Sequence, residues 1–450
     1  MQGKHEIDMT TGALPPKIIK FTIPFMLSAM IQTMFNAADN AVIGAFDGSN
    51  ALAAVGSTGS ITSFAVNLFL GLSVGTNVLI ANAIGSVNKK ACEQSVHTSV
   101  TISLLIGVIV GALCFIFTGT FLNLLNCPEE VFDLAKIYLR TYFIGMPALS
   151  AYNFGAAILR SKGDTQRPLI YLIIAGILNV ILNLILVIVF KMSTAGVGIA
   201  TTVSQYLSAF LTLRALTKDE DDCKLIIKKL RITAPVALKI LKIGIPASIQ
   251  GLMFSISNLS IQSSVNSFGA DAMAGVGAGS SLNHIVYNSI SAFGQSALAF
   301  TGQNYGARNF GRIKKVYMWN CIIMLCSWAI VTLIVRLNTE SLLRIFLPDN
   351  DNAMAYSRLS TKMLSLTYFL AGFMEVSVCM CRGLGRSTVP AVISVFGICG
   401  IRLLWLATAF KKYHTFVCLY ISYPVTWVVT TIAVAIYFAL VYRKLLKHHQ

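Results

Sequence analysis

KIIKFTIP, residues 17–24, returns as KILKIGIP at residues 239–246, an offset of 222 positions in a chain of 450 residues. Two more pairs of segments keep this offset to within one residue: ALAAVG at 51–56 with AMAGVG at 272–277, and RSKGDTQRP at 160–168 with RGLGRSTVP at 382–390. A period this long, present twice, indicates a duplicated domain and not a solenoid of short repeats. In a hydrophobic chain, such a duplication is typical of secondary transporters.

The composition is that of an integral membrane protein. Hydrophobic residues make up 55% of the chain and charged residues 12%, and the mean hydropathy is +0.71, whereas a soluble domain carries about 25% charged residues. Apolar runs of about 20 residues are long enough to cross the hydrocarbon core of a bilayer. We therefore expect an all-α protein with twelve membrane spans, six in each repeat, near residues 18–44, 52–83, 95–120, 131–157, 168–190, 195–216, 238–265, 272–303, 317–336, 354–380, 388–409 and 415–441.

Six spans return the chain to the side on which it started, so the two repeats are expected to be parallel. We expect an N-terminal six-helix lobe over residues 1–216, a polar linker over 217–236 and a C-terminal six-helix lobe over 237–450. Most of the 35 Lys and Arg residues fall on the side of the linker and the termini. By the positive-inside rule, this predicts a multi-pass protein of the cell membrane with both termini in the cytoplasm. The net charge of +17 is thus a topology signal and predicts no nucleic-acid partner.

Signatures of catalysis are missing from the sequence. It has no HExxH, GxSxG or Walker A motif, so we expect neither an enzyme with catalytic residues nor a cofactor. The ten cysteines show no metal-ligand spacing, and we interpret them as small apolar residues of the spans.

Polar residues recur at helical spacing inside several spans. Gln32, Asn36 and Asp39 lie on one face of the first span, and such a face is turned toward protein or water because lipid offers no polar partner. One interpretation is that the amides only bond neighbouring helices. Since the stripes occur in both repeats, we favour a solvated substrate cavity between the lobes, lined by Gln32, Asn67, Asn153, Asn258, Gln262, His284, Tyr287, Asn288, Gln295, Glu375 and Arg402.

Asp39 is the clearest ionisable group within a span. Counted from the outer ends of the spans at about 1.5 Å per residue, Asp39, Asn183 and Thr202 lie in one layer, with Asn179 one turn away. A carboxylate among amide and hydroxyl groups suits a proton or a sodium ion. We therefore predict a cation-coupling site made of Asp39, Asn179, Asn183, Thr202 and Asn36, with sodium at Asp39 as the one candidate metal ion.

Glu375 and Arg402 are charged residues within spans of the second repeat. The sequence leaves open whether they pair with each other. Their depths differ by about eight residues, or about 12 Å of helix, so a pair would need long side chains and a bent helix.

Several of these segments together resemble the multidrug and toxic compound extrusion (MATE) family, in particular the prokaryotic branch with the staphylococcal-type multidrug exporters. The resemblance covers residues 15–445 and rests on the Gln32, Asn36 and Asp39 stripe followed by Ile43 and Gly44, on ALAAVG and RSKGDTQRP, and on GQNYGARN at residues 302–309. It implies two six-helix lobes that form a V and export cationic lipophilic drugs by alternating access, against a flow of protons or sodium ions.

The resemblance also implies roles for individual residues. Asp39 would belong to the cation site of the first lobe, with Asn179 and Thr202 as further ligands, and Glu375 is similar to an acid that some members carry in the tenth span. Asn183 stands where many members have a second acid. This departure leaves the identity and the number of the coupled ions open.

Taken together, the sequence predicts a monomeric antiporter of small organic cations and other xenobiotics, coupled to protons or sodium. The alternative is a flippase for a lipid-linked precursor, which belongs to the same superfamily. A flippase is expected to have a more cationic cavity for phosphate groups, and among the cavity residues only Arg402 favours it.

Overall fold

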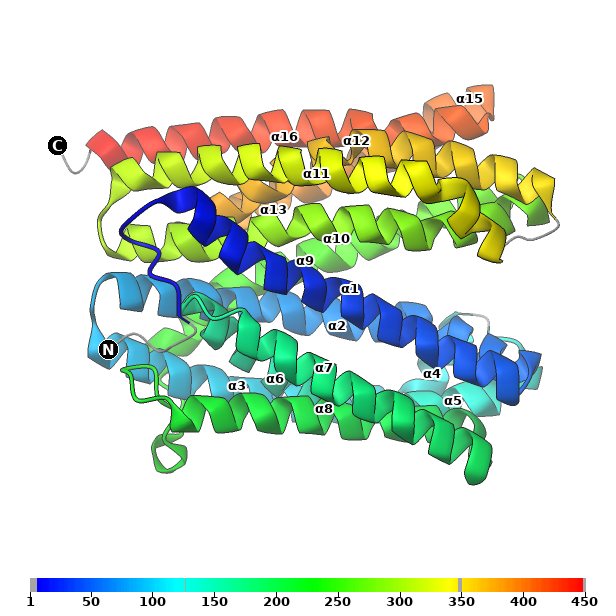
Figure 1. Cartoon of the computed structure of the whole chain (residues 1–450), viewed down its shortest axis with the longest axis horizontal. Helices are drawn as coiled ribbons and strands as arrows, with labels where there is room; N and C mark the ends of the chain where they lie inside the picture. Colours follow the sequence, from blue (N-terminus) through cyan, green and yellow to red (C-terminus); the bar gives the residue numbers. More distant parts are fainter. Residues whose placement is uncertain (1–5, 126, 347–349, 448–450) are drawn as a thin grey trace. The chain divides into compact units, whose positions relative to one another are not determined.

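The structure is a computed structural model that describes residues 6–125, 127–346 and 350–447. Every regular element in these ranges is a helix (Figure 1). The contacts between helices divide the chain into two units. The first unit contains residues 6–8 and 27–248, and the second contains residues 9–26 and 249–447.

The first unit is built mainly from the helices of the first repeat, without the first half of α1 and with the first half of α9. Within it, α3 packs on α6, α2 packs on α6, and α7 packs on α8. The elements of this part of the chain are α1 (Leu14–Phe46), α2 (Ser49–Gly85), α3 (Lys89–Ile116), α4 (Thr118–Leu124), α5 (Glu129–Ile144), α6 (Met146–Ser161), α7 (Gln166–Asn183), the π-helical turn η1 (Leu184–Val189), α8 (Ser193–Lys218) and the short 3₁₀ turn η2 (Ile227–Lys229).

The second unit contains the helices of the second repeat, and the contact of α10 with α12 is its most extensive. Its elements are α9 (Ala234–Asn266), α10 (Ala270–Gly306), α11 (Phe310–Phe346), α12 (Asp351–Gly383), α13 (Thr388–Ser394), the π-helical turn η3 (Val395–Gly400), α14 (Ile401–Trp405), the π-helical turn η4 (Leu406–Phe410), α15 (Lys411–Tyr413) and α16 (Phe416–Lys447).

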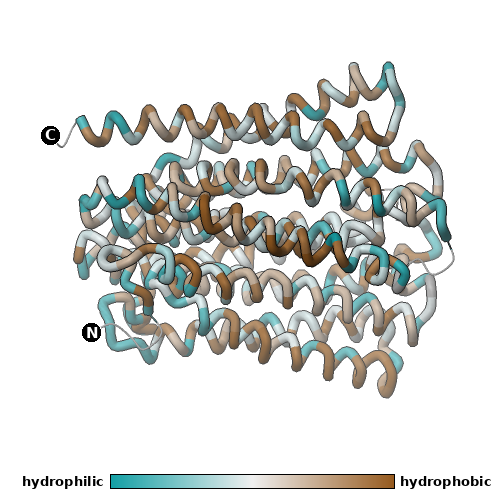
Figure 2. Tube along the Cα trace, turned by 45° about the horizontal axis from the view of Figure 1, so that its top comes forward, coloured by the Kyte–Doolittle hydropathy of each residue, from teal (hydrophilic) through white to brown (hydrophobic). Residues whose placement is uncertain are grey.

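Each of the twelve expected spans coincides with a helix, or with helices joined through a bend or a π turn. Nine helices of the described chain are long and apolar enough to cross a membrane, and ten if the bent pair α5 and α6 is one span. The two others, α8 and α10, are rich in Gly, Ser and Thr, which lowers their hydropathy. Hydrophobic residues follow the middle of the helices, and hydrophilic residues gather toward their ends (Figure 2).

The two prolines of the opening repeat mark the places where the chain passes from one unit to the other. Pro24 lies within α1 and Pro246 within α9, and the unit boundaries follow two residues later, after Met26 and after Ser248. A proline inside a helix removes one backbone hydrogen bond and favours a kink. As a result, the first half of α1 belongs to the second unit, and the first half of α9 belongs to the first unit. The boundaries between the units therefore lie at these helix midpoints and not at the linker.

Glycines let the first half of α9 lie directly against α2. A Cβ atom at Gly75 would be 2.1 Å from the Ile240 carbonyl oxygen, and one at Gly71 would be 2.4 Å from the Ser248 Cα. Gly244 in turn lies against the Leu72 backbone. Small residues at four-residue spacing allow such close helix crossings in membranes.

The GQNYGARN segment holds the chain just before α1. Asn304 is fully buried, and its side-chain amide donates to the Met9 carbonyl oxygen at 3.0 Å. Arg312 donates to the same carbonyl at 3.2 Å. Further along, Phe21 of α1 meets Phe300 of α10 edge to face.

The fourth span differs between the repeats. In the first unit, α5 and α6 meet at Gly145 with a bend of 47°, because Pro147 in the first turn of α6 cannot continue the backbone hydrogen bonds of α5. The corresponding residue at the 222-residue offset is Phe369, and α12 is continuous there.

Two cysteines form a bond that the sequence did not predict. Cys92, at the start of α3, and Cys223, in the linker, form a disulfide across 131 residues with a Cα separation of 5.6 Å. Our interpretation of all ten cysteines as apolar residues is therefore wrong for this pair. Neither residue is in a recognisable motif, because the partners are brought together only by the path of the linker.

Candidate functional site

Asp39 of α1 lies beside α7 in the first unit. The Asn183 side-chain amide donates to Asp39 Oδ1 at 2.5 Å and to Asn179 Oδ1 at 3.3 Å. Asn179 in turn donates to Thr201 Oγ1 at 3.5 Å. Asp39 and Asn183, which the depth count put in one layer, and Asn179, which it put one turn away, thus form one continuous chain of hydrogen bonds.

Two local features bring these helices together. Gly176 lies one turn before Asn179, and a Cβ atom there would overlap the Phe35 ring of α1 at 1.8 Å. The π-helical turn η1 starts directly after Asn183. Such turns are rare and are frequent at functional sites.

Thr202 and Asn36 are placed differently from the rest of the predicted cation site. Thr202 Oγ1 donates to the Thr141 carbonyl oxygen at 2.7 Å, on α5, so its hydroxyl is turned away from the asparagines. The neighbouring Thr201 takes its place beside Asn179. Asn36 is exposed one turn before Asp39 on α1. The depth count could not separate Thr201 from Thr202, because adjacent residues have nearly the same depth and differ only in the face they occupy.

The chemistry of this group is that of a small hard cation or a proton. Asn183 is 1% exposed, and its Oδ1 accepts no hydrogen bond from the residues that the structure describes. A buried carbonyl oxygen without a donor is costly and is also a suitable ligand for a cation. Together with the carboxylate of Asp39, the Asn179 carbonyl and the Thr201 hydroxyl, it provides the oxygen ligands that such an ion takes.

Arg402 lies in α14 of the second unit and does not pair with Glu375. Its Nη1 donates to Ser257 Oγ at 3.2 Å and to Asn258 Oδ1 at 3.1 Å, both on α9. Its guanidinium carbon is 4.3 Å from the centre of the Tyr423 ring. The sequence left open whether Arg402 pairs with Glu375, and in the structure Arg402 bonds to residues of α9 instead.

Glu375 belongs to α12, and its side chain lies against α10. A Cβ atom at Gly294 of α10 would be 2.7 Å from Glu375 Cγ, and the Cys379 thiol lies 3.5 Å from Glu375 Oε1. Its repeat partner Asn153, in the first unit, is 8% exposed and donates to the Leu149 carbonyl of its own helix at 2.8 Å. These two cavity candidates are therefore engaged within their own units.

The remaining cavity candidates fall in both units. Gln262 donates to Asn266 Oδ1 at 3.2 Å on α9, and the Tyr287 ring packs against Tyr368 with 5.9 Å between ring centres. His284 and Gln32 are exposed, while Asn67, Asn288 and Gln295 are partly buried. Their assignment to a substrate cavity stays a prediction.

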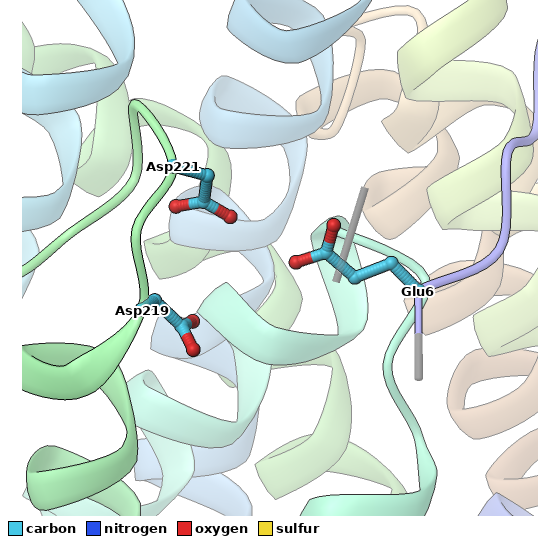
Figure 3. A group of neighbouring side chains, drawn as sticks. All are labelled: Glu6, Asp219 and Asp221. Carbon is cyan, nitrogen blue, oxygen red and sulfur yellow. The ribbon is translucent and has the colours of Figure 1, made fainter. Parts of the chain in front are cut away.

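A cluster of charged side chains lies outside the membrane spans of the first unit. The Lys162 side chain is 3% exposed and its ammonium forms ion pairs with Glu6 at 3.0 Å, Asp219 at 2.5 Å and also Asp221. Figure 3 shows the three carboxylates facing one another. Arg167 adds a second cation 2.6 Å from Asp219.

The ammonium of Lys162 offsets the repulsion between the three neighbouring carboxylates. Burial alone would raise the pKa of Asp219, but hydrogen bonds from Arg167 and Lys162 outweigh burial and lower its pKa below the usual value. Burial likewise disfavours the charged form of Lys162, but the charges of Asp221 and Asp219 outweigh this and raise its pKa. The group is therefore an ion-pair cluster, because a cationic side chain already occupies its centre.

The long apolar helices and the duplicated landmarks define a multi-pass helical membrane protein with two repeated halves. The sequence model of the MatE family matches this chain twice, at residues 24–185 and 246–406. The chain belongs to the MatE family, a family of multidrug transporters. The two matches coincide with the two repeats that the sequence predicted.

Individual relatives agree with this assignment. The chain is 26% identical over 436 residues to a probable multidrug resistance protein, YoeA, of Bacillus subtilis, with 94% of this chain and 93% of the relative covered. It is 22% identical over 382 residues to the multidrug export protein MepA of Staphylococcus saprophyticus, with 84% of each chain covered. A solved structure described as the outward-facing conformation of a multidrug resistance MATE family transporter shares the fold, with a TM-score of 0.90, 22% identity and coverage of 99% of this chain and 100% of that one.

Proposed function

We propose that the chain is a monomeric, cation-coupled antiporter that exports cationic lipophilic compounds across the cell membrane by alternating access, with both termini in the cytoplasm. Membership of a multidrug transporter family supports the export of small organic molecules. The observation that carries the coupling is the chain from Asp39 through Asn183 to Asn179, with the Asn183 carbonyl oxygen free of donors among the described residues.

In this proposal, a proton or sodium ion competes with Asn183 for the carboxylate of Asp39. With no ion bound, the amide of Asn183 donates to Asp39. A bound ion weakens that hydrogen bond and releases α1 from α7. An ion shifts a conformational equilibrium only by its differential affinity for the two states, so each tenfold difference supplies about 1.4 kcal/mol. The polar stripes of the spans are proposed to contact the cargo.

The Asp39→Asn variant tests this proposal in proteoliposomes loaded with ethidium. Efflux is driven in separate experiments by a pH gradient and by a sodium gradient, which also identifies the ion. Because the amide has nearly the same shape as the carboxylate but lacks its charge, we expect a folded variant with no gradient-driven efflux. Asp47→Asn is the matched control, since Asp47 also accepts a side-chain hydrogen bond, from Ser193, and lies beyond the end of α1.

Full efflux by Asp39→Asn, or an equal loss in Asp47→Asn, would contradict the coupling role of Asp39. The flippase alternative is not favoured, because YoeA and MepA are named for multidrug resistance and multidrug export.

A further inference from the structure

The second unit contains a buried cation that the coupling mechanism does not use. Arg402 is 3% exposed and lies near the middle of the span Thr388–Tyr413. Its guanidinium contacts neutral groups: the side chains of Ser257 and Asn258 and the Tyr423 ring. No carboxylate of the described chain forms an ion pair with it, and its Nε donates to no acceptor there.

This arrangement is unfavourable for a residue that serves packing alone. An arginine stays charged in proteins, and a charge within a membrane span is costly unless it is paired or hydrated. A buried guanidinium that lacks an acid partner has unused capacity for one. An arginine fork binds a carboxylate or phosphate through two parallel hydrogen bonds.

The backbone around Arg402 contains more π-helical turns than the matching span of the first repeat. The π-helical turn η4 corresponds at the 222-residue offset to η1 of the first unit. The turn η3, which ends two residues before Arg402, corresponds to residues 173–178, which lie within the regular helix α7. The second repeat thus has an additional π turn immediately before its buried cation, and the residue matching Arg402 in the first repeat is Val180.

The Tyr423 ring lies against the guanidinium, and further aromatic rings continue from it. The ring centres of Tyr423 and Trp427 are 5.5 Å apart, and those of Trp427 and Tyr368 are 5.3 Å apart. Tyr368 continues to Tyr287 at 5.9 Å. Such faces stack with flat aromatic rings, so the group offers a cation for an acid and ring faces for an aromatic system.

We propose that Arg402, together with Tyr423 and Trp427, is a specificity-determining group that binds the acid group of zwitterionic aromatic cargo and so favours such cargo over compounds without the acid. The inference rests on the proposed transport function. Arg402 binds the carboxylate, and Tyr423 with Trp427 contacts the ring system. Ser257 and Asn258 hold the guanidinium in place when no acid is bound.

The test compares two cargoes that differ in the acid group. Norfloxacin carries an aromatic carboxylate, and its methyl ester does not. Equilibrium dialysis with the purified full chain measures the binding of both, and proteoliposome efflux measures their transport. We expect Arg402→Gln to weaken norfloxacin binding at least tenfold and to change ester binding less than twofold, with Arg402→Lys in between.

Arg382→Gln is the matched control. Arg382 is also buried, at 6% exposure, and donates to Gln250 Oε1 at 2.9 Å, but it lies in the last turn of α12. It is expected to leave the ratio of the two affinities unchanged. Equal losses for both cargoes in Arg402→Gln, or no loss for either, would overturn the inference and assign Arg402 a purely structural role.

Binding and transport also separate this inference from the proposed function. If wild-type protein binds norfloxacin through Arg402 but neither gradient drives efflux, the antiport proposal fails and the acid site stands. If efflux of ethidium is coupled but norfloxacin and its ester bind alike to the wild type, the acid site fails and the antiport proposal stands.

Discussion

Replacing Lys162 with Met removes the cation from the centre of the ion-pair cluster. The ammonium contacts Glu6, Asp219 and Asp221, and methionine has a similar length without the charge. Of these acids, Asp219 keeps Arg167 as a partner. Glu6 and Asp221 lose their contact with this ammonium. Removing one partner of a buried ion pair costs about 3–5 kcal/mol, because the charge left behind is uncompensated.

The expected effect can be expressed as a melting temperature. For domains of 150–250 residues, 1 kcal/mol corresponds to about 2–4 °C, and the first unit has about 230 residues. The lower end of the stability loss then predicts a melting temperature about 6 °C or more below that of the wild type, measured on purified protein in detergent at pH 7. Lys229→Met is the control, since Lys229 pairs with Glu93 at 2.8 Å with both side chains about half exposed. Exposed pairs contribute about 0–1 kcal/mol.

The pKa shifts of Asp219 and Lys162 also predict how this stability difference changes with pH. Because the folded-state pKa of Asp219 is lowered, its stabilisation is present above the ordinary carboxyl pKa of about 4 and is lost as the pH falls through the folded pKa. Because the pKa of Lys162 is raised, its stabilisation is present below about pH 10 and is lost as the pH rises through the folded pKa. The difference between wild type and Lys162→Met should therefore be largest between these limits and shrink below about pH 4. A variant that melts within 1 °C of the wild type at pH 7, or with the same shift as Lys229→Met, would refute this reasoning.

Two further predictions concern packing and the disulfide. Gly75→Val should destabilise the protein by about 1–3 kcal/mol, because the new Cβ would meet the Ile240 carbonyl oxygen. Gly56→Val on the same helix is the control, since no atom lies within 4 Å of a Cβ there, and it should melt like the wild type. Equal melting temperatures of the two variants would exclude the close crossing of α2 and α9. In a variant whose eight free cysteines are replaced by Ser, Cys92 and Cys223 should react with maleimide only after reduction, and labelling without reductant would show that the bond is absent.

The helices could be predicted from the sequence because apolar length is a direct physical requirement of a span. The repeat at Pro24 and Pro246 also indicated the duplication. It could not reveal that each proline lies beside a unit boundary, since that depends on which helices the first halves of α1 and α9 pack against. The bend at Gly145 follows from Pro147, but the hydropathy of the fourth span does not show it.

The candidate sites were predictable where depth alone was enough. Asp39 and Asn183 are 144 residues apart, and counting residues from the outer span ends placed them at a similar depth, although the count to Asn183 passes through the π turn η1. The same count failed to find the partners of Arg402. The π turn η3 shifts every later residue around the helix axis, and no sequence signal announced it. Asn258 was already recognised as a polar residue of α9, so a search for amide partners could have found this contact.

The exchange of helix halves at Pro24 and Pro246 bears on how the chain is made. The first unit is incomplete until residues 234–248 have left the ribosome, although its other helices are finished by residue 218. The second unit needs residues 9–26, which were synthesised first. The first unit therefore cannot reach its final packing until the chain has passed through the linker into α9, whereas the second unit packs onto a helix half that was made before it. A cut in the linker would yield two fragments that each carry a helix half the other requires, and only their coexpression would restore both.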